Sequence, residues 1–446
     1  MMASTTGAQR EALLNGPILR TMMGLGLPTI LVIAAQTFVA VMEAYWISRL
    51  GTNAIAGVSL VLPLFVLMGT MSNGGIGGGV SSAIARAVGG GKGVEANALL
   101  AHAMLIAILF GLAFTAMMLL AGRPIYVALG GNGSALDHAL AYSRWVFGLS
   151  VVIWLVNLMG SALRGAGEVH LPARISLIGA VALIPLVPAM IFGFGPIPRM
   201  EIAGAGIAIG IYYGGALIVL LRYLLSGNGV LTLSLHPVAR DYITAIMGVG
   251  LISAVGTLTA SLTTVAITGT VGAYGAASLA GFGIASRIDS LLVPLLFGLG
   301  TAVVTMVGVA TGAGDHARAR RVAWTAAALA FGVTEVIGLL LFAMPSLWNE
   351  VFTQDTTVLT AGNAYLKAVS PFYGFIGLGL VLYFANQGRG KMAWPFVAGL
   401  TRLLVTAMGA WWLAGLGATL SMLFIAVAVG SLLFGLINAY GFWRSS

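Results

Sequence analysis

The sequence has no cysteine and very little charge. The lack of cysteine excludes disulfide bonds and leaves the redox compartment of the protein open. Charged residues make up 7% of the chain, against about a quarter in soluble domains, so a water-facing surface cannot be covered. Residues 1–17 also lack the charged start, short apolar run and small-residue cleavage site of a secretory signal. The first hydrophobic segment is therefore expected to stay in the mature protein.

Hydrophobic residues are abundant instead, at 59% of the chain. A helix needs about 20 mostly apolar residues to cross a bilayer, and the sequence contains a dozen such runs. A membrane β-barrel is excluded because its alternating strands of about 10 residues are absent. The 63 glycines suit close packing of membrane helices. The predicted spans are 19–46, 54–81, 96–121, 139–161, 173–194, 203–225, 242–270, 277–309, 322–345, 361–385, 394–414 and 418–441.

The net charge of +9 is unevenly distributed between the two sides of the predicted membrane. With the N-terminus in the cytoplasm, fifteen lysines and arginines fall on the cytoplasmic side and five on the other. This bias predicts a multi-pass protein of the cytoplasmic (inner) membrane with both termini cytoplasmic. The basic charge is thus interpreted as an orientation signal, and we expect no nucleic-acid partner.

An internal repeat divides the chain into two related halves. When position 51 is aligned with position 275, GTNAIAG (51–57) matches GAASLAG (275–281), and GLGLP (24–28) matches GVGLI (248–252) at the same offset. A second alignment, shifted by one position less, places Gly165 on Gly388. This alignment also matches the other glycine and the proline of the loop 163–172 with those of 387–395. We call the shift of this second alignment the repeat offset. Six spans in each half give the halves the same orientation, as in the parallel repeats of several secondary transporters.

The predicted fold is therefore an all-α integral membrane protein with twelve transmembrane helices in two pseudo-symmetric six-helix bundles. The N-terminal bundle is predicted over 1–225 and the C-terminal bundle over 242–446. Residues 226–241 are expected to form a cytoplasmic linker between them.

Four segments then give a family resemblance. They are GPILRTMMGLGLPTILVIAAQTFVAVMEAYWISRLGTNAIAGVSLVLPLF, ALRGAGEVHLPARISLIGAV, ASLAGFGIASRIDSLLVPLLFGLGTAVVTMVGVATGAGD and the QGRGK loop. With their spacing, the chain resembles the multidrug and toxic compound extrusion (MATE) family over nearly its whole length. The resemblance implies a V-shaped pair of bundles in which exit of cationic amphiphilic compounds is coupled to entry of protons or sodium.

Three acidic residues lie well inside predicted spans: Glu43, Asp289 and Glu335. A carboxylate inside a membrane costs several kcal/mol unless it is paired, protonated or in a wet cavity. Glu43 is the first candidate for proton coupling, since the MATE pattern usually has aspartate there and the following Ala-Tyr-Trp fits the family's small-aromatic-aromatic run. A solvated position near the outer end of the span is the alternative for Glu43.

Asp289 is the second coupling candidate, at a position where the family often carries an acid, with a structural ion pair as the alternative. Arg287 is two residues away, a spacing that does not place both side chains on one helix face, so each is expected to have a partner on another helix. A hydrogen bond to a neighbouring helix is the favoured role of Glu335. Pro28 is a candidate hinge in the first span, although membrane helices also tolerate proline without such a role.

The sequence departs from the family at one cation site. Many prokaryotic members carry asparagine and aspartate in the fifth span of the first half, where this chain has Leu183 and Val187. Sodium prefers several hard oxygen ligands, which these side chains do not supply. Protons are therefore favoured over sodium as the coupling ion, and we expect neither a cofactor nor a bound metal.

Polar and aromatic residues within the spans are the candidates for substrate contact. Aromatic faces attract organic cations, but tyrosine and tryptophan also form interfacial belts in membrane proteins. The candidates are Gln36, Tyr45, Trp46, Asn73, Asn157, Tyr373 and Tyr383, followed by Trp154 and Asn386.

Other apparent motifs do not predict chemistry. GGIGGGV (74–80) lacks the spacing of a dinucleotide-binding loop, and GGGKG (89–93) lacks the serine or threonine of a phosphate loop. The five histidines have no metal-ligand spacing, and we find neither a nucleophile elbow nor a pair of carboxylates. The sequence therefore does not indicate an enzyme.

The leading hypothesis is a secondary active multidrug exporter that exchanges protons for organic cations by alternating access. One chain contains both halves and is expected to function as a monomer with membrane lipid around it. A flippase for a lipid-linked precursor and a sodium-coupled exporter of the same substrates are the alternatives. A channel is disfavoured because channels usually show ring symmetry rather than a two-part repeat.

Overall fold

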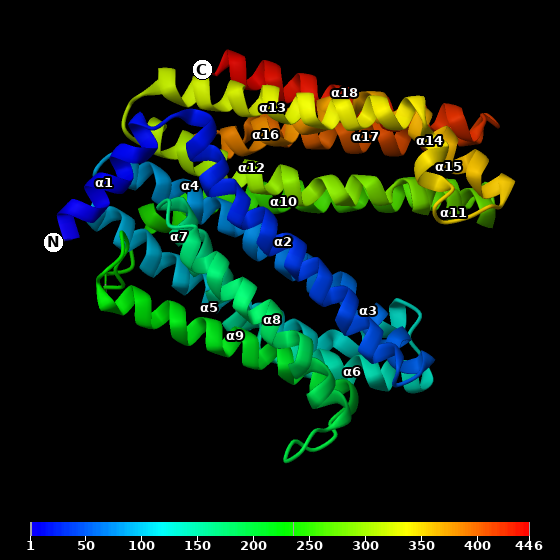
Figure 1. Ribbon diagram of the computed structural model, residues 1–446, viewed down its shortest axis with the longest axis horizontal. Helices are drawn as coiled ribbons and strands as arrows, with labels where there is room; N and C mark the ends of the chain where they lie inside the picture. The colour runs from blue at the N-terminus through cyan, green and yellow to red at the C-terminus, as the bar shows by residue number, and fades with distance from the viewer. Residues whose placement is uncertain (1, 235, 446) are drawn as a thin grey trace. The chain divides into compact units, whose positions relative to one another are not determined.

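The computed structural model describes residues 2–234 and 236–445, which fold almost entirely into helices (Figure 1). Within these residues the β-structure is one isolated bridge between Phe194 and Ile197. In this described part of the chain, eleven helical segments are long and apolar enough to cross a membrane. Two further helices, joined at a bend of 48°, supply the twelfth span if counted as one. The all-α fold with twelve spans predicted from the hydrophobic runs is thus confirmed.

The chain forms two compact units. Unit 1 contains Met1–Glu11 and Pro28–Gly250, and unit 2 contains Ala12–Leu27 and Leu251–Ser446. Three helices belong to both units because the division falls inside them. They are α1 (Met2–Asn15), α2 (Ile18–Ser48) and α10 (Arg240–Gly272).

The other helices of unit 1 follow one another through short turns. In Figure 1 they run in colour from blue to green. They are α3 (Thr52–Thr70), the π-helical turn η1 (Met71–Gly75), α4 (Ile76–Gly89), α5 (Gly93–Ala128), α6 (Gly133–Gly148), α7 (Ser150–Gly165), α8 (His170–Phe192) and α9 (Glu201–Ser226). Residues 227–239 connect α9 to α10, and Leu235, inside the predicted linker 226–241, lies outside the described residues.

Unit 2 contains the remaining helices, coloured yellow-green to red in Figure 1. They are α11 (Ala276–Ala285), α12 (Arg287–Gly312), α13 (His316–Ala343), α14 (Pro345–Asn349), α15 (Thr356–Val369), the 3-10 turn η2 (Ser370–Phe372), α16 (Tyr373–Arg389), α17 (Ala393–Gly415) and α18 (Leu420–Arg444). One span of each unit is interrupted at an equivalent position. In unit 1, α6 and α7 meet at Leu149. In unit 2, the turn η2 ends at Phe372, which the repeat offset aligns with Leu149.

Glycines at equivalent positions pack in the same way in both units, which confirms the internal repeat. A Cβ atom on Gly57 of α3 would lie 2.7 Å from the carbonyl oxygen of Ala135 on α6. A Cβ atom on Gly281 of α11 would lie 2.4 Å from the carbonyl oxygen of Val358 on α15. The repeat offset aligns Ala135 with Val358, so the same helix pair makes the same backbone approach in each unit.

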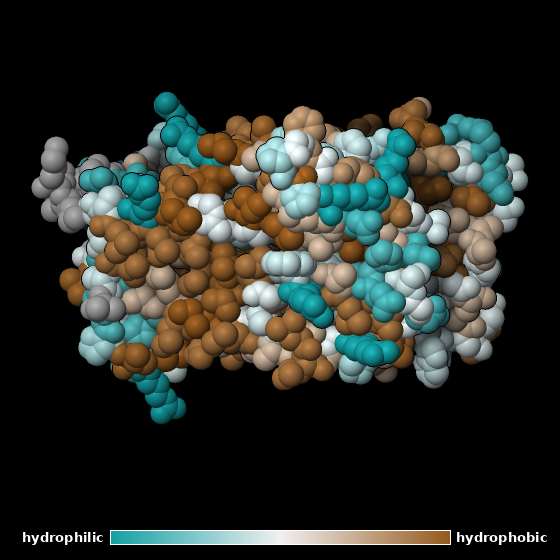
Figure 2. Space-filling model, turned by 90° about the horizontal axis from the view of Figure 1, so that it is seen from below, coloured by the Kyte–Doolittle hydropathy of each residue, from teal (hydrophilic) through white to brown (hydrophobic). Residues whose placement is uncertain are grey.

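The surface is apolar, as a lipid-facing surface must be. Figure 2 shows extensive areas of hydrophobic side chains, with the hydrophilic residues gathered in separate patches. Leu120 of α5 is 85% exposed and Trp411 of α17 is 75% exposed. Such exposure of large apolar side chains would be unfavourable in water. Apolar side chains also fill the interiors, so the helices are hydrophobic both inside and outside. The chain is therefore a multi-pass integral membrane protein.

Candidate functional site

The acidic residue of the first span meets a tyrosine within unit 1. The hydroxyl of Tyr142, on α6, donates a hydrogen bond of 2.7 Å to Oε1 of Glu43, on α2. Tyr142 is 2% exposed and Glu43 is half-buried, so bulk solvent does not surround the carboxyl group. The two ion pairs found among the described side chains, Lys92–Glu95 and Arg199–Glu201, do not involve Glu43. A neutral hydrogen-bond donor therefore faces this carboxyl group.

Unit 2 has a second carboxyl–tyrosine pair. The hydroxyl of Tyr365, on α15, donates a hydrogen bond of 2.5 Å to Oδ2 of Asp289, on α12. The Tyr373 hydroxyl and the Arg402 guanidinium lie within electrostatic range of the same carboxyl group. Asp289 thus differs from Glu43 in having a guanidinium within electrostatic range, although the ion pairs found among the described residues do not join these two side chains.

The two tyrosines occupy equivalent positions of the repeat, because the repeat offset aligns Tyr142 with Tyr365. The acids do not, since Glu43 is on α2, which precedes α3, whereas Asp289 is on α12, which follows α11, the counterpart of α3. The candidate residues predicted from the sequence included neither Tyr142 nor Tyr365 as a carboxyl partner. The sequence did contain a signal for these two residues, because the repeat offset aligns the two tyrosines and both fall in predicted spans.

Arg287 and Glu335 have partners on other segments. The guanidinium of Arg287 lies 5.5 Å from the ring centroid of Phe352, just beyond α14, which agrees with the expectation that it does not pair with Asp289. The Oε2 atom of Glu335, on α13, accepts a hydrogen bond of 2.8 Å from the backbone N–H of Gly374. That N–H lies in the first turn of α16, where a carboxylate is favoured by the helix dipole. The expected hydrogen bond from Glu335 to a neighbouring helix is confirmed.

The substrate candidates of α2 are partly exposed. Gln36 and Tyr45 are exposed, and Trp46 is half-buried with its ring centroid 6.1 Å from that of Phe192. The Tyr45 hydroxyl accepts a hydrogen bond of 2.7 Å from Arg49. These side chains lie within about two turns of Glu43 along the helix.

A polar cluster connects η1 with α7 in unit 1. The side-chain amide of Asn157 donates a hydrogen bond of 2.8 Å to the hydroxyl of Ser72. The guanidinium of Arg164 donates to Oδ1 of Asn73 at 3.2 Å and to the Ser161 hydroxyl at 2.7 Å. Asn73 sits in the π-helical turn, and such turns frequently occur at functional sites.

The other substrate candidates are buried or, in the case of Tyr383, half-buried within their own units. Tyr373 is fully buried near Asp289, and the Tyr383 hydroxyl donates to the Ser253 carbonyl at 3.4 Å. Trp154 is fully buried and stacks on Phe110, a contact typical of a hydrophobic core. Asn386 is 1% exposed and donates to the carbonyl of Leu382 in its own helix.

The predicted hinge lies in α2, and the altered cation site lies in α8. Pro28 lies inside α2, and it is the first residue of that helix that belongs to unit 1. Leu183 and Val187 of α8 are both buried and offer no ligand oxygen from their side chains. Across residues 2–234 and 236–445, no three histidine, aspartate or glutamate side chains come together as metal ligands.

A repeated bundle of membrane helices with a carboxyl group inside each copy is an architecture of secondary transporters. The model of the MatE family matches the chain over residues 28–189 and again over 253–412, one match in each half. The chain therefore belongs to the MatE family, whose members are transporters.

Two curated relatives illustrate the family. The chain is 25% identical over 443 residues to the FAD transporter of Shewanella oneidensis, covering 97% of this chain and 96% of that protein. It is 24% identical over 396 residues to the probable multidrug resistance protein NorM of Thermotoga maritima, covering 85% of this chain and 82% of that protein.

Solved structures of MATE transporters share the fold. A MATE transporter in the bent conformation gives a TM-score of 0.90 at 21% identity, covering 98% of this chain and 97% of that one. An outward-facing multidrug resistance MATE transporter gives a TM-score of 0.87 at 22% identity, covering 97% of both chains. These likenesses establish the MATE-like fold of this chain.

Proposed function

We propose that this protein exports small organic compounds across the cytoplasmic membrane in exchange for protons bound at Glu43. The observation that carries the proposal is the hydrogen bond from Tyr142 to the Glu43 carboxyl group. A carboxylate in an apolar region is costly, and a neutral hydroxyl offsets only part of that cost. The carboxyl group can therefore take up and release a proton as its surroundings change, which is what proton coupling requires.

Asp289 is the second coupling candidate. The Arg402 guanidinium lies within electrostatic range of Asp289, whereas a neutral donor faces Glu43. We assign the main coupling role to Glu43 because a nearby cation favours the ionised form of a carboxyl group and so opposes proton uptake.

Cationic amphiphilic compounds are the proposed substrates. The exposed Tyr45 and Gln36 and the half-buried Trp46 lie within about two turns of Glu43 on α2 and add aromatic and polar groups to the same helix. Aromatic rings and a carboxylate together attract organic cations. The NorM relative, named as a probable multidrug resistance protein, supports this assignment.

A second candidate substrate class is an anionic dinucleotide. Arg164, hydrogen-bonded to Asn73 beside the π-helical turn, places a guanidinium within unit 1, and guanidinium groups bind phosphate oxygens well. The relative that covers 97% of this chain is named an FAD transporter. FAD is therefore the compound with which to test this class.

The test uses purified protein in liposomes, with export of ethidium and of FAD measured under an imposed pH gradient and under an imposed sodium gradient. We expect the pH gradient to drive export and Glu43→Gln to reduce it by about tenfold or more, a change of about 1.4 kcal/mol. Glu335→Gln is the matched control, because its oxygen can still accept the Gly374 N–H, and its rate should stay close to that of the unmodified protein.

Two results would contradict the proposal. One is sodium-driven export that Glu43→Gln leaves unchanged. The other is full loss of proton-driven export in Asp289→Asn with normal export in Glu43→Gln, which would assign the coupled proton to unit 2. Ethidium export without FAD export supports the cationic class, and the reverse supports the dinucleotide class.

A further inference from the structure

A buried histidine of unit 1 lies outside the carboxyl–tyrosine pairs. His102 is on α5, less than three turns from the start of that helix, and is 2% exposed. Its Nδ1 lies 2.7 Å from the carbonyl oxygen of Ala98, one turn earlier in α5. Its Nε2 accepts a hydrogen bond of 2.9 Å from the backbone N–H of Ala239, directly before α10. The imidazole therefore joins α5 to the start of α10.

These two hydrogen bonds determine the protonation state of the imidazole. A backbone N–H can only donate, so Nε2 must present a lone pair, and a carbonyl oxygen can only accept, so Nδ1 must carry the hydrogen. The ring in this arrangement is the neutral Nδ1–H tautomer. A proton added to Nε2 would set two N–H donors against each other and leave a charge in a buried position. The contact with Ala239 can therefore form only while His102 is neutral.

The contact acts on the beginning of a helix that both units share. The first N–H groups of a helix have no partner within it, and His102 supplies an acceptor from another helix for the N–H just before α10. The ring of Tyr242, in the first turn of α10, lies 5.0 Å from the imidazole, centroid to centroid. α10 belongs to unit 1 up to Gly250 and to unit 2 beyond it. His102 thus holds the unit 1 end of this helix.

The histidine is peculiar to unit 1. The repeat offset aligns His102 with Thr325 of α13, whose hydroxyl keeps its proton at physiological pH. The helix arrangement that the two units have in common therefore does not require a titratable side chain at this position.

We propose that His102 is a pH-sensitive contact that holds the start of α10 while it is neutral and releases it when it is protonated. Histidine changes its charge between about pH 5 and pH 8, and protonation removes the acceptor that Ala239 needs. The proposal is independent of proton coupling at Glu43, because Glu43 and Tyr142 are on α2 and α6.

Charges of both signs occur near this contact. Acidic side chains favour the proton on the imidazole and cationic ones oppose it, and the variants below leave all of these charged side chains in place. The charged and titratable residues on the elements packed at this end of α5 are Arg86 of α4, Lys92 and Glu95 at the start of α5, Arg164 of α7, His236 of the connecting segment, and Arg240, Asp241 and Tyr242 of α10.

The test is hydrogen–deuterium exchange of the full-length protein in detergent at about pH 8 and about pH 5, with rates corrected for the intrinsic effect of pH on exchange. We expect the amide protection of the peptide that contains Ala239 to fall several-fold at the lower pH. Peptides from α16 are the internal reference, because that helix contains neither an acid nor a histidine, and they should keep their protection.

His102→Gln separates the imidazole from the other titrating groups. The glutamine oxygen can accept from the Ala239 N–H but cannot be protonated in this pH range, so exchange at Ala239 should no longer depend on pH. His236→Gln is the matched control. His236 lies three residues before Ala239 and contacts Ser234, so its replacement should leave the pH dependence in place.

Four results would overturn the proposal. They are equal protection of Ala239 at both pH values in the unmodified protein, the same fall in His102→Gln, loss of the fall in His236→Gln, and an equal fall in α16, which would show general loosening of the protein. The first and the last of these comparisons need no variant to fold. Because exchange is measured without transport, a failure here is distinguishable from a failure of the coupling role of Glu43.

Discussion

At the residue scale, the two membrane carboxyl groups differ in the groups that face them. Glu43 accepts a hydrogen bond from Tyr142, whereas Asp289 has both Tyr365 and the nearby Arg402. A neutral donor offsets part of the cost of the ionised form, and a cation within electrostatic range opposes proton uptake further. The proposed division of roles between the two acids follows from this difference.

The hydroxyl of Tyr142 should set the pH at which Glu43 exchanges its proton. Tyr142→Phe removes a donor that stabilises the ionised carboxyl group, so the proton is released only at higher pH. We expect the pH profile of proton-driven export to move upward by about one unit. Tyr126→Phe, another buried tyrosine of unit 1, serves as the control and should leave the profile in place. An unshifted profile in Tyr142→Phe would show that this hydrogen bond does not tune the coupling.

At the element scale, close helix packing depends on glycines whose positions repeat in the two units. Gly57 and Gly281 each allow one helix to approach the backbone of another at equivalent places. A side chain there would meet a carbonyl oxygen, which cannot move aside as the end of a flexible side chain can. The helix pairs α3–α6 and α11–α15 are therefore fixed by backbone contact.

Gly281→Ala should destabilise unit 2. The added methyl group would lie 2.4 Å from the Val358 carbonyl oxygen, and such overpacking costs about 1–3 kcal/mol. Gly122→Ala on α5 is the control, since the nearest atom to its methyl group would be 3.6 Å away. Thermal unfolding of both variants in detergent measures the effect. An equal unfolding midpoint in the two variants would show that α11 and α15 can separate at little cost.

The start of α15 should contribute a pH-dependent stability. The Asp355 carboxylate accepts hydrogen bonds from the backbone N–H groups of Thr357 and Val358, which holds its pKa below the usual range. A lowered pKa in the folded state stabilises it above the unfolded value of about 3.9, and that contribution is lost as the pH falls through the folded pKa.

Asp355→Ala should therefore lower the thermal unfolding midpoint at pH 7 by more than it does at about pH 3. Unfolding curves of the variant and the unmodified protein at both pH values measure this difference. A constant difference at the two pH values would show that the charge of Asp355 does not contribute to the capping of α15.

At the scale of the whole molecule, continuous helices join the two units. α2 passes from unit 2 to unit 1 between Leu27 and Pro28, and α10 passes from unit 1 to unit 2 after Gly250. Proline removes one backbone hydrogen bond and weakens a helix at its own turn. We propose that Pro28 is a hinge of α2, at the place where this helix passes from one unit to the other.

Pro28→Ala should slow transport without loss of folding. The restored backbone hydrogen bond stiffens α2, so we expect the turnover rate in liposomes to fall several-fold while the thermal unfolding midpoint is kept or raised. Pro63→Ala is the control, because Pro63 lies within α3 and entirely within unit 1. Equal turnover in the unmodified protein and in Pro28→Ala would remove the hinge role from Pro28.

The sequence alone determined the membrane location, the all-α class, the number of spans and the repeat. These properties depend on the length and order of apolar runs, and a bilayer imposes helices on any such run because each backbone polar group must be satisfied within it. The sequence also identified Glu43, Asp289 and Glu335, since an acid in a hydrophobic run is conspicuous without any knowledge of the fold.

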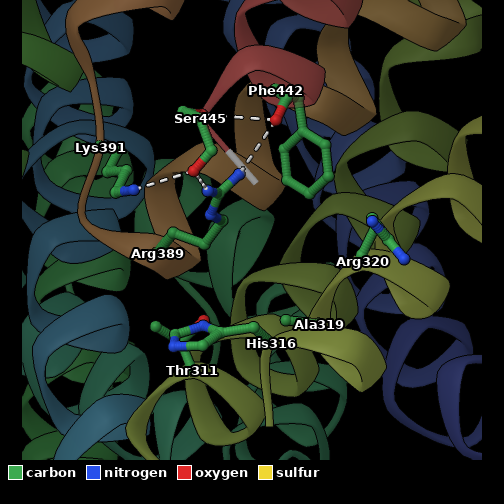
Figure 3. A pocket seen from close by; sticks show the side chains of 8 residues that line it. All are labelled: Thr311, His316, Ala319, Arg320, Arg389, Lys391, Phe442 and Ser445. Carbon is green, nitrogen blue, oxygen red and sulfur yellow. Dashed lines mark hydrogen bonds between the residues drawn. The ribbon is translucent and has the colours of Figure 1, made fainter. Parts of the chain in front are cut away.

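Only the tertiary structure decided which groups face those acids. Tyr142 is 99 residues from Glu43 and Tyr365 is 76 residues from Asp289, and the hydrophobic pattern does not specify which helices bring them together. A cavity lined in part by His316, Lys391 and Ser445 likewise needs three distant segments to meet at one end of unit 2 (Figure 3). Hydrophobic burial is non-directional, so it places helices in the membrane, whereas the partners of each polar side chain depend on how those helices pack.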